Sequence, residues 1–484
     1  MFYPEFEEVL KLKDQGNLIP LFFECDAGFE TPLSVYSKVA STPYSFLLES
    51  AEGVNKDHTY SFIGCDPDLV IKTGEGQEYG CIDPLIPVQK ELSKYKVVQL
   101  PQMPRFKFTG GVVGYMSYES VNYFEKLNSF LPDTIGLPES IFMLTKTFLE
   151  FDHLKNKIKI ITHIDLTGDV KTAYEYAVNE IKKILEKLKS NSINDVDLID
   201  FDYQKPEVIS NINKDNYINI VKKIKKYIYE GDVIQVVPSQ RLQRKINVTP
   251  LEIYKSLREI NPSPYMYYLD FGEFQIAGAS PEMLTKVQDG VVSTHPIAGT
   301  RPRGNNNLED KKMEKELLSD PKEIAEHIML VDLGRNDLGK VCEPGTVNVT
   351  NFMGIERYSH VMHIVSNVEG KLSSEFDNYD AFRSCFPAGT LSGAPKIRAM
   401  EIISEMENER RGPYGGAIGH FDFSGNMDTA IAIRTLVIKD GVAYAQSGGG
   451  VVFDSNPELE YKETLHKASA LLKSIDQAEK QISE

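Results

Sequence analysis

The sequence predicts an α+β fold in which antiparallel sheets are covered by helices. In the second half of the chain, short runs of alternating apolar and polar residues follow one another with only a few residues between them. Residues 265–271 and 274–277 form one such pair, and residues 429–438 and 442–447 form another. Strands joined by such short turns pair antiparallel, whereas parallel strands need a crossover of a dozen or more residues. We therefore expect an α+β architecture rather than a doubly wound one.

The first part of the chain mixes strands and helices. Strands are expected at residues 44–50, 60–64 and 110–119, and a hairpin across 148–162. An amphipathic helix is expected at residues 172–189, because its apolar residues recur on one side. Residues 190–213 are rich in Asn, Asp and Ser and are the best candidate linker. The chain is thus expected to divide into an amino-terminal region, residues 1–200, interleaved with the core, and a main domain, residues 201–484.

After the linker, capping residues, prolines at the first helical position and the spacing of apolar residues predict the helices. Asp215 is a candidate cap, and Pro250, Pro321 and Pro457 suit the first helical position. The expected helices cover residues 215–230, 250–261, 310–318, 321–333, 396–407 and 457–473. The remaining expected strands cover residues 233–238, 291–294, 361–368 and 416–423.

Composition excludes several classes of protein. The formal net charge is −17 and no basic run is evident, which disfavours nucleic acid and anionic membranes as partners. No apolar run approaches the length of a membrane span, and the acidic amino terminus does not resemble a signal peptide. The five cysteines form no C-x-x-C pair and their number is odd, so neither a zinc site nor a disulfide framework is expected. A reducing cytoplasm fits this pattern.

Two predicted helices each carry a pair of glutamates three residues apart, Glu323 with Glu326 and Glu460 with Glu463. Such residues share one helical face, where like charges repel unless a cation lies between them. Oxygen ligands alone suit Mg²⁺. The alternative is that acids near a helix start act as caps and favour the helix dipole. That alternative explains Glu323 and part of Glu460, so the deeper Glu326 and Glu463 are the preferred metal ligands.

Other stretches suggest an anionic ligand. Residues 295–304 predict an extended run ending in a turn, where Arg301 and Arg303 would offer two forked cations beside Thr300. A surface turn with solvated arginines is the alternative. Residues 386–396 predict an anion site at a helix start, with Ser392 and Lys396 in it. The glycine-rich residues 412–416 and 448–450, and an arginine in strand 431–434, are each explained equally well by a tight turn or a solvated strand.

Taken together, these motifs resemble the chorismate-utilising enzymes, which include anthranilate synthase component I, aminodeoxychorismate synthase, isochorismate synthase and salicylate synthase. The resemblance is dense over about residues 205–475. Residues 325–337 look like the family's metal helix, and the region of Glu463 looks like its partner. Aminodeoxychorismate synthase commonly carries a nucleophilic lysine before the Gly-Thr pair. Here that position is Ala298, as in anthranilate synthase component I.

The resemblance implies a fold and a set of site residues. The fold would be an α/β/β/α sandwich of two large, mostly antiparallel sheets. Glu282 would be the general acid that protonates the departing ring hydroxyl, His363 would assist elimination, and Thr390 would complete the catalytic set. The implied substrate-binding residues are Gly299, Thr300, Tyr414, Arg434, Gly448, Gly449, Gly450 and Lys467. Gln235 lies where isochorismate-forming relatives carry a base lysine, so water is disfavoured as the nucleophile.

The implied activity is Mg²⁺-dependent conversion of chorismate and ammonia to anthranilate and pyruvate, in tryptophan biosynthesis. The ammonia would come from a separate glutamine amidotransferase subunit, because this chain lacks a glycine-flanked nucleophilic cysteine. One alternative is aminodeoxychorismate synthase component I. Another is a catalytically inactive amino-acid-sensing subunit, which the retention of both glutamate pairs together with Glu282 disfavours.

Two further motifs resemble the feedback element of anthranilate synthases. Residues 47–50 and 261–266 imply a tryptophan site built from Glu49, Ser50, Pro264, Tyr265 and Met266. An acid would bind the ammonium of tryptophan, and the rigid apolar residues would hold the indole. The alternative is that the leucines before Glu49 are core residues and Ser50 is a turn residue. Thr59 stands where relatives often have arginine, which would weaken the site. Residues 1–200 would then be regulatory and residues 201–484 catalytic.

Overall fold

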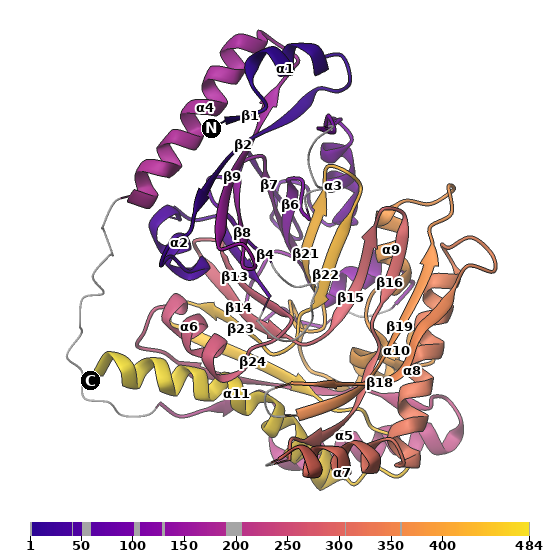
Figure 1. Ribbon diagram of the computed structural model, residues 1–484. Coiled ribbons are helices and arrows are strands. Elements are labelled where there is room, and N and C mark those ends of the chain that lie inside the picture. Colours follow the sequence, from indigo (N-terminus) through magenta and orange to yellow (C-terminus); the bar gives the residue numbers. More distant parts are fainter. Residues whose placement is uncertain are drawn as a thin grey trace.

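The structure is a computed structural model and describes residues 2–40, 42–50, 60–100, 107–127, 131–189, 206–304, 306–358 and 361–483. Two large antiparallel sheets pack against each other, and helices cover their outer faces (Figure 1). The predicted α+β class and the sandwich implied by the resemblance are confirmed.

The first sheet has twelve strands within the described residues, and every ladder in it is antiparallel. Its strands, in spatial order, are β1 (Phe2–Tyr3), β2 (Leu18–Asp26), β9 (Lys157–Asp165), β8 (Phe148–Asp152), β4 (Tyr60–Gly64), β3 (Ser45–Glu49), β13 (Tyr265–Asp270), β14 (Phe274–Ser280), β23 (Thr435–Lys439), β24 (Val442–Gly448), β12 (Ser239–Lys245) and β10 (Ile209–Ser210).

The second sheet has ten strands within the described residues. In spatial order they are β17 (Ile297–Pro302), β19 (Val361–Lys371), β16 (Val291–Thr294), β15 (Met283–Gln288), β22 (Met427–Ile431), β21 (Ala417–Asp422), β6 (Gly111–Met116), β7 (Ser140–Thr145) and β5 (Leu69–Thr73), with β18 (Asn348–Arg357) also paired to β19. A separate short ladder joins β11 (Gln235–Val236) to β20 (Gly393–Ala394).

The helices of the described chain are α1 (Phe6–Leu12), α2 (Pro32–Val39), α3 (Leu85–Leu92), α4 (Val170–Lys189), α5 (Lys214–Glu230), α6 (Pro250–Ile260), α7 (Asn307–Leu317), α8 (Pro321–Gly339), α9 (Asn378–Cys385), α10 (Lys396–Met406) and α11 (Pro457–Ser483), with 3₁₀ turns η1 (Tyr118–Tyr123) and η2 (Gly389–Leu391). Proline at the first turn of α2, α6 and α8 follows a Thr or Asp cap, as helix starts favour. None of these helices is long and apolar enough to cross a membrane.

Three apolar layers hold the sandwich together. Between the sheets, residues such as Phe148 and Ile276 of the first sheet pack with Val113 and Ile418 of the second. The outer face of the first sheet packs on α2, α4, α6 and α11, and that of the second on α3, α8, α9 and α10. Burial of these faces supplies the main driving force for folding.

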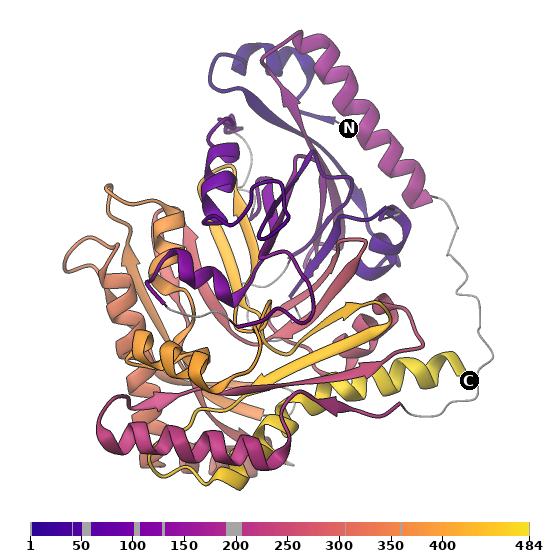
Figure 2. The same ribbon diagram turned by 180° about the vertical axis from the view of Figure 1, so that it is seen from behind.

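Strands distant in the sequence lie side by side in both sheets. β3 pairs with β13, and β6 pairs with β21. From behind, strands of the first 150 residues, coloured indigo to purple, lie beside yellow strands near the carboxyl terminus (Figure 2). The division at residue 200 and a regulatory role for residues 1–200 stay predictions. Most of the candidate linker, residues 190–205, and also Thr59, lie outside the described residues.

The structure corrects several element boundaries. The expected single strand at 429–438 is two strands in different sheets, β22 and β23, because Arg434 adopts a left-handed φ of 51° between them. β15, β18 and α9 were not expected. β18 lies at the margin of its sheet and is largely exposed, so it lacks the apolar alternation that marks a half-buried strand. α8 and α11 also extend beyond their predicted ends.

Candidate functional site

A cavity of about 650 Å³ lies where the chain passes from one sheet to the other. Glu282 sits on the passage from β14 to β15, and Arg434 on the passage from β22 back to β23. The two passages are bonded together, since Ile431 donates its N–H to the carbonyl of Glu282 at 3.1 Å. Side chains that are far apart in the sequence are thereby brought to one place.

Glu282 is almost completely buried beside this cavity. Burial raises the pKa of its carboxyl group to about 8. Thr390 donates a hydrogen bond from Oγ1 to Glu282 Oε1 at 3.1 Å, which opposes the rise only in part. At neutral pH the group is therefore protonated, which is the state a general acid needs.

Two cations, Arg434 and Lys467, line the cavity together with the phenol of Tyr414. Arg434 is half-buried and donates to the carbonyl of Lys467 at 2.6 Å. Lys467 Nζ pairs with Glu463 at 2.7 Å and donates to the carbonyl of Gly448 at 3.0 Å. A Cβ atom added to Gly448 would lie 2.9 Å from the Tyr414 hydroxyl, so the glycine allows the phenol to approach the strand end. Two charges and a hydroxyl thus surround a space that would suit a carboxylate.

Gly299 also lines the cavity and forms a β-bulge there. Its φ is 72°, a conformation that favours glycine, and the register with β19 shifts at this residue. The bulge sets Thr300 opposite His363, whose Nδ1 lies 3.0 Å from both the Thr300 hydroxyl and the Gly299 carbonyl. A carbonyl only accepts, so Nδ1 carries the hydrogen and Nε2 is left to take a proton. Burial lowers the pKa of His363, which favours this neutral form.

The two glutamate pairs line the same cavity from α8 and α11. Burial and the charge of Glu323 raise the pKa of Glu326, and burial raises that of Glu460, whose Oε2 has no hydrogen-bond partner. A Cβ at Gly449 would lie 3.1 Å from Glu460 and 3.5 Å from Glu463, so bare backbone lies against both.

A divalent cation would relieve both the mutual repulsion and the unpaired oxygen. Among the described residues, no three acidic, histidine or cysteine side chains are grouped so as to hold a metal by themselves. Glu326 and Glu463, with Glu323 and Glu460 beside them, are the residues that could hold Mg²⁺, which keeps several waters and takes few carboxylates.

Sequence reasoning overlooked several lining residues, among them Lys322, Gln446 and His466. It also overlooked the contact of Gln235, which donates from Nε2 to Glu326 Oε1 at 3.3 Å. A Cβ at Gly450 would lie 2.3 Å from Gln235, so this glycine makes room for the amide. Each of these side chains is ordinary in its local sequence, and only the three-dimensional arrangement reveals it.

Three predicted cations are not free to bind a ligand. Arg301 pairs with Asp320 at 2.7 Å, and also with Glu316 and Glu323. Arg303 pairs with Asp310 at 2.6 Å. Lys396 pairs with Asp337 at 2.7 Å, and Thr390 rather than Lys396 reaches the cavity from the 386–396 stretch. The expectation of anion-binding arginines in this turn is therefore wrong, because acids on nearby helices neutralise them.

A second, smaller pocket of about 110 Å³ lies between the sheets at β3 and β13. Glu49, Ser50, Tyr265 and Met266 line it, whereas Pro264 is buried and is not part of the lining. The Glu49 carboxylate accepts a hydrogen bond from Tyr254 at 2.6 Å and pairs with Arg258 at 3.3 Å. Lys286, Asp428 and His420 also line the pocket and were not expected.

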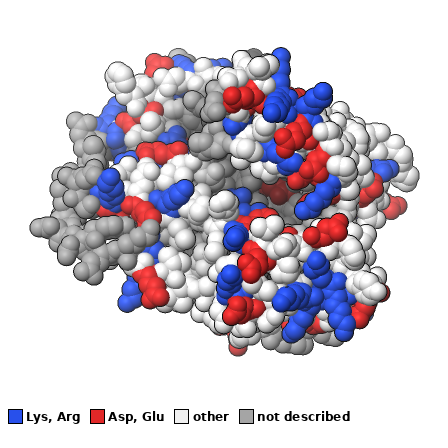
Figure 3. Space-filling view, turned by 90° about the horizontal axis from the view of Figure 1, so that it is seen from below, with Lys and Arg blue, Asp and Glu red and all other residues white. Residues whose placement is uncertain are grey.

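On the face of the molecule seen from below, the surface charges attract anions only weakly. Lys and Arg side chains there lie next to Asp and Glu side chains, and the face is hollowed near its centre (Figure 3). Attraction of an anionic ligand therefore depends on the individual cations of the cavity, since opposite surface charges compensate each other at a distance.

Comparison with known proteins places this geometry in a family. The sequence model described as chorismate binding enzyme matches residues 43–473. Anthranilate synthase component 1 of Acetivibrio thermocellus is 48% identical, with 99% of each chain covered, and that of Pseudomonas aeruginosa is 46% identical, with 98% of this chain and 99% of the relative covered.

Solved structures give the same result. Anthranilate synthase component I of Streptococcus pneumoniae superposes with a TM-score of 0.77 at 35% identity, covering 93% of this chain and 99% of that one. The menaquinone-specific isochorismate synthase of Escherichia coli shares the fold, with a TM-score of 0.72 at 17% identity and 97% and 98% coverage. The chain belongs to the chorismate-binding enzyme family.

Proposed function

We propose that this chain is the chorismate-converting subunit of an anthranilate synthase, which forms anthranilate and pyruvate from chorismate and ammonia. One observation carries the proposal: a single cavity is lined by a carboxylic acid that is neutral at pH 7, Glu282, by three cations and by two pairs of glutamates. Chorismate carries two carboxylates and a ring hydroxyl, and the cavity offers a partner for each. Full-length relatives with this activity in their names support the proposal.

In the proposed reaction, Arg434 and Lys467 hold the substrate carboxylates. Bound Mg²⁺, held by Glu326 and Glu463 with support from Glu323 and Glu460, would supply positive charge for a carboxylate. Glu282 gives its proton to the ring hydroxyl, which leaves as water while the nitrogen of ammonia bonds to the ring.

The aminated ring then loses pyruvate, and Nε2 of His363 assists the proton movement of this second step. His363 is suited to this role because its other nitrogen is fixed to the Gly299 carbonyl. Ala298 offers no nucleophile, so no covalent enzyme intermediate is involved.

We further propose that ammonia comes from a glutamine amidotransferase subunit, and that tryptophan inhibits the enzyme by binding in the smaller pocket. The free cysteines fit a cytoplasmic enzyme. In that pocket Glu49 is already paired, so the tryptophan ammonium would share this carboxylate with Arg258 or bind Asp428 instead. β3 and β13 pair with Glu49 directly opposite Met266, which supports a single site made from both motifs.

The test is product identification. Purified protein is incubated with chorismate, Mg²⁺ and ammonium chloride, and the products are separated by chromatography with authentic standards. Anthranilate and pyruvate in equal amounts are expected. 4-Amino-4-deoxychorismate would assign the protein to the aminodeoxychorismate branch, and unchanged chorismate would favour a catalytically inactive sensing subunit.

A further inference from the structure

Gln446 is a buried side chain of the cavity that the mechanism above does not use. It lies on β24, 8% of its surface is exposed, and it lines the cavity beside the strand end at Gly448. Its amide oxygen Oε1 is buried and has no hydrogen-bond partner. Leaving a buried acceptor unpaired is costly, so such an atom in a ligand cavity indicates a missing donor.

The orientation of this amide is fixed by three other residues. Arg411 donates to both oxygens of Glu407, at 2.9 and 2.6 Å, so both of these oxygens act as acceptors. Ser239 Oγ lies 2.9 Å from Glu407 Oε1 and must therefore give its hydrogen to the carboxylate. The lone pairs of Ser239 Oγ then accept from Gln446 Nε2 at 2.8 Å. The nitrogen of Gln446 is thus held by the protein, and its oxygen is left for a ligand.

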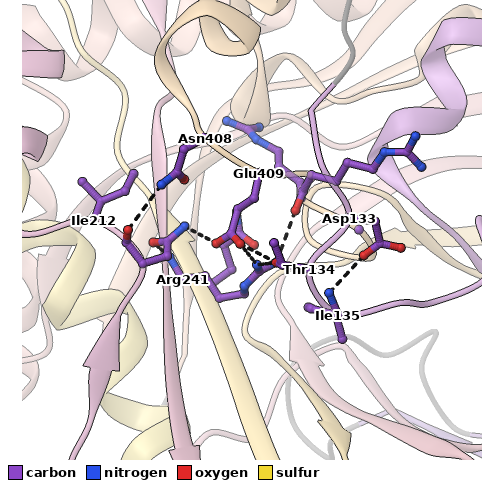
Figure 4. Close-up of polar contacts among 12 residues, drawn as sticks. Asp133, Thr134, Ile135, Ile212, Arg241, Asn408 and Glu409 are labelled. Atoms are coloured by element: carbon purple, nitrogen blue, oxygen red, sulfur yellow. Dashed lines mark hydrogen bonds and ion pairs between the residues drawn. The ribbon is translucent and has the colours of Figure 1, made fainter.

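Further hydrogen bonds hold the residues of this chain in place. Arg411 is buried and also donates to the carbonyls of Val237 and Leu391, each at 2.7 Å, and both of these residues line the cavity. Arg241, the cross-strand partner of Gln446, donates to Thr134 and pairs with Glu409 (Figure 4). The strand that carries Ser239 is therefore also anchored at Arg241, two residues along on the same face of the sheet.

The chemistry of the two proposed substrates decides which one supplies the donor. Doubly ionised chorismate has a single O–H, which the proposed reaction assigns to Glu282. Its carboxylates only accept, so a carbonyl-type oxygen would repel them. Ammonia has three N–H donors and no assigned partner. Among the cavity residues, Gln235 also has an unpaired oxygen, but its amide contacts Glu326, a proposed metal ligand.

We propose that Gln446 Oε1 binds ammonia and orients it for attack on the ring, with Ser239, Glu407 and Arg411 as positioning residues. This inference rests on the proposed function. A neutral amide suits the task, because a carboxylate would stabilise ammonium, which has no lone pair, whereas an amide oxygen accepts an N–H and leaves the lone pair free. After attack, the ammonium nitrogen returns one proton to the Glu282 carboxylate, which restores the acid.

The test measures KM separately for ammonium and for chorismate at one fixed pH. Gln446→Met keeps the length of the side chain but removes the acceptor. We expect its KM for ammonium to rise about 3- to 10-fold, the range for one lost neutral hydrogen bond, with KM for chorismate within about twofold of wild type. Ser239→Ala releases the amide and should give a smaller rise in the same constant. This second variant keeps the test valid if Gln446→Met does not fold.

A matched control separates binding from a general loosening of the sheet. Gln240, on β12, is also buried but lies outside the cavity lining, and its amide is bonded at both ends, to Thr464 and to Ser210. Gln240→Met should lower thermal stability and leave KM for ammonium unchanged. An unchanged ammonium KM in both Gln446→Met and Ser239→Ala, or an equal rise in KM for chorismate, would overturn the inference while the proposed function stands. A wild-type protein that forms no anthranilate would overturn both.

Discussion

Replacing Glu282 by glutamine should abolish activity and at the same time make the protein more stable at alkaline pH. The carboxyl group is buried, and its pKa is raised to about 8. Glutamine has nearly the same shape and carries no charge, so burial imposes no cost of ionisation on it at any pH. A general acid typically contributes about 10²- to 10⁴-fold to the rate, and we expect a loss of that size in kcat.

The size of the stability effect follows from the pKa. An unfolded glutamate has a pKa near 4.5, so between about pH 5 and 8 the folded protein holds a proton that the unfolded chain has lost. Wild-type stability therefore falls as pH rises through this window. The difference between the two pKa values corresponds to about 5 kcal/mol. Unfolding entropy for a chain of this length is about 1 kcal/mol per degree, so the effect on Tm is about 5 °C.

The assay is thermal unfolding of both proteins from pH 5 to pH 9. All other titrating groups are shared, so the difference in Tm isolates Glu282. We expect the Tm of Glu282→Gln, relative to that of wild type, to increase by about 5 °C in total as the pH rises from 5 to 8. Above pH 8 this difference in Tm should stay constant. Wild-type kcat should fall as pH rises above about 8, because the acid form is lost. A Tm difference that is constant over the whole range would show that Glu282 is ionised in the fold and would refute the reasoning.

The remaining predictions concern the metal, the nucleophile and regulation. Glu326→Gln and Glu463→Gln should each abolish Mg²⁺-dependent anthranilate formation without lowering Tm. Glu458 is exposed and lies on the same helix as Glu463, so Glu458→Gln is the control and should be active. Near wild-type turnover in Glu326→Gln or Glu463→Gln would contradict a ligand role. Since Ala298 cannot attack, intact-mass measurement after quenching with chorismate should show no added mass, and an adduct would place the protein in another branch of the family. Ser50→Phe should fill the smaller pocket and raise the tryptophan concentration needed for half inhibition by about tenfold or more, with uninhibited turnover retained; equal inhibition of variant and wild type would exclude this pocket as the regulatory site.

The sequence alone determined what depends on local pattern. Alternating runs and short turns predicted antiparallel strands, and Pro321 after a capping aspartate predicted the start of α8. Spacing of three residues placed Glu323 with Glu326 on one helical face, and Ala298 in a recognisable motif indicated the branch of the family. Each of these features is expressed within a few residues of the chain, where propensity, capping and periodicity act.

Only the tertiary structure decided how those pieces meet. No local sequence pattern indicates that β22 and β23 belong to different sheets. The strand is interrupted at Arg434 because its two halves pair with strands from elsewhere in the chain. Arg301 looked free in the sequence, yet acids 15 to 22 residues away neutralise it. Gln446 looked ordinary in the sequence, and only the hydrogen-bond chain that begins at Arg411 leaves its amide oxygen for a ligand. Pairing of strands and neutralisation of charge are decided by long-range contacts, which periodicity does not encode.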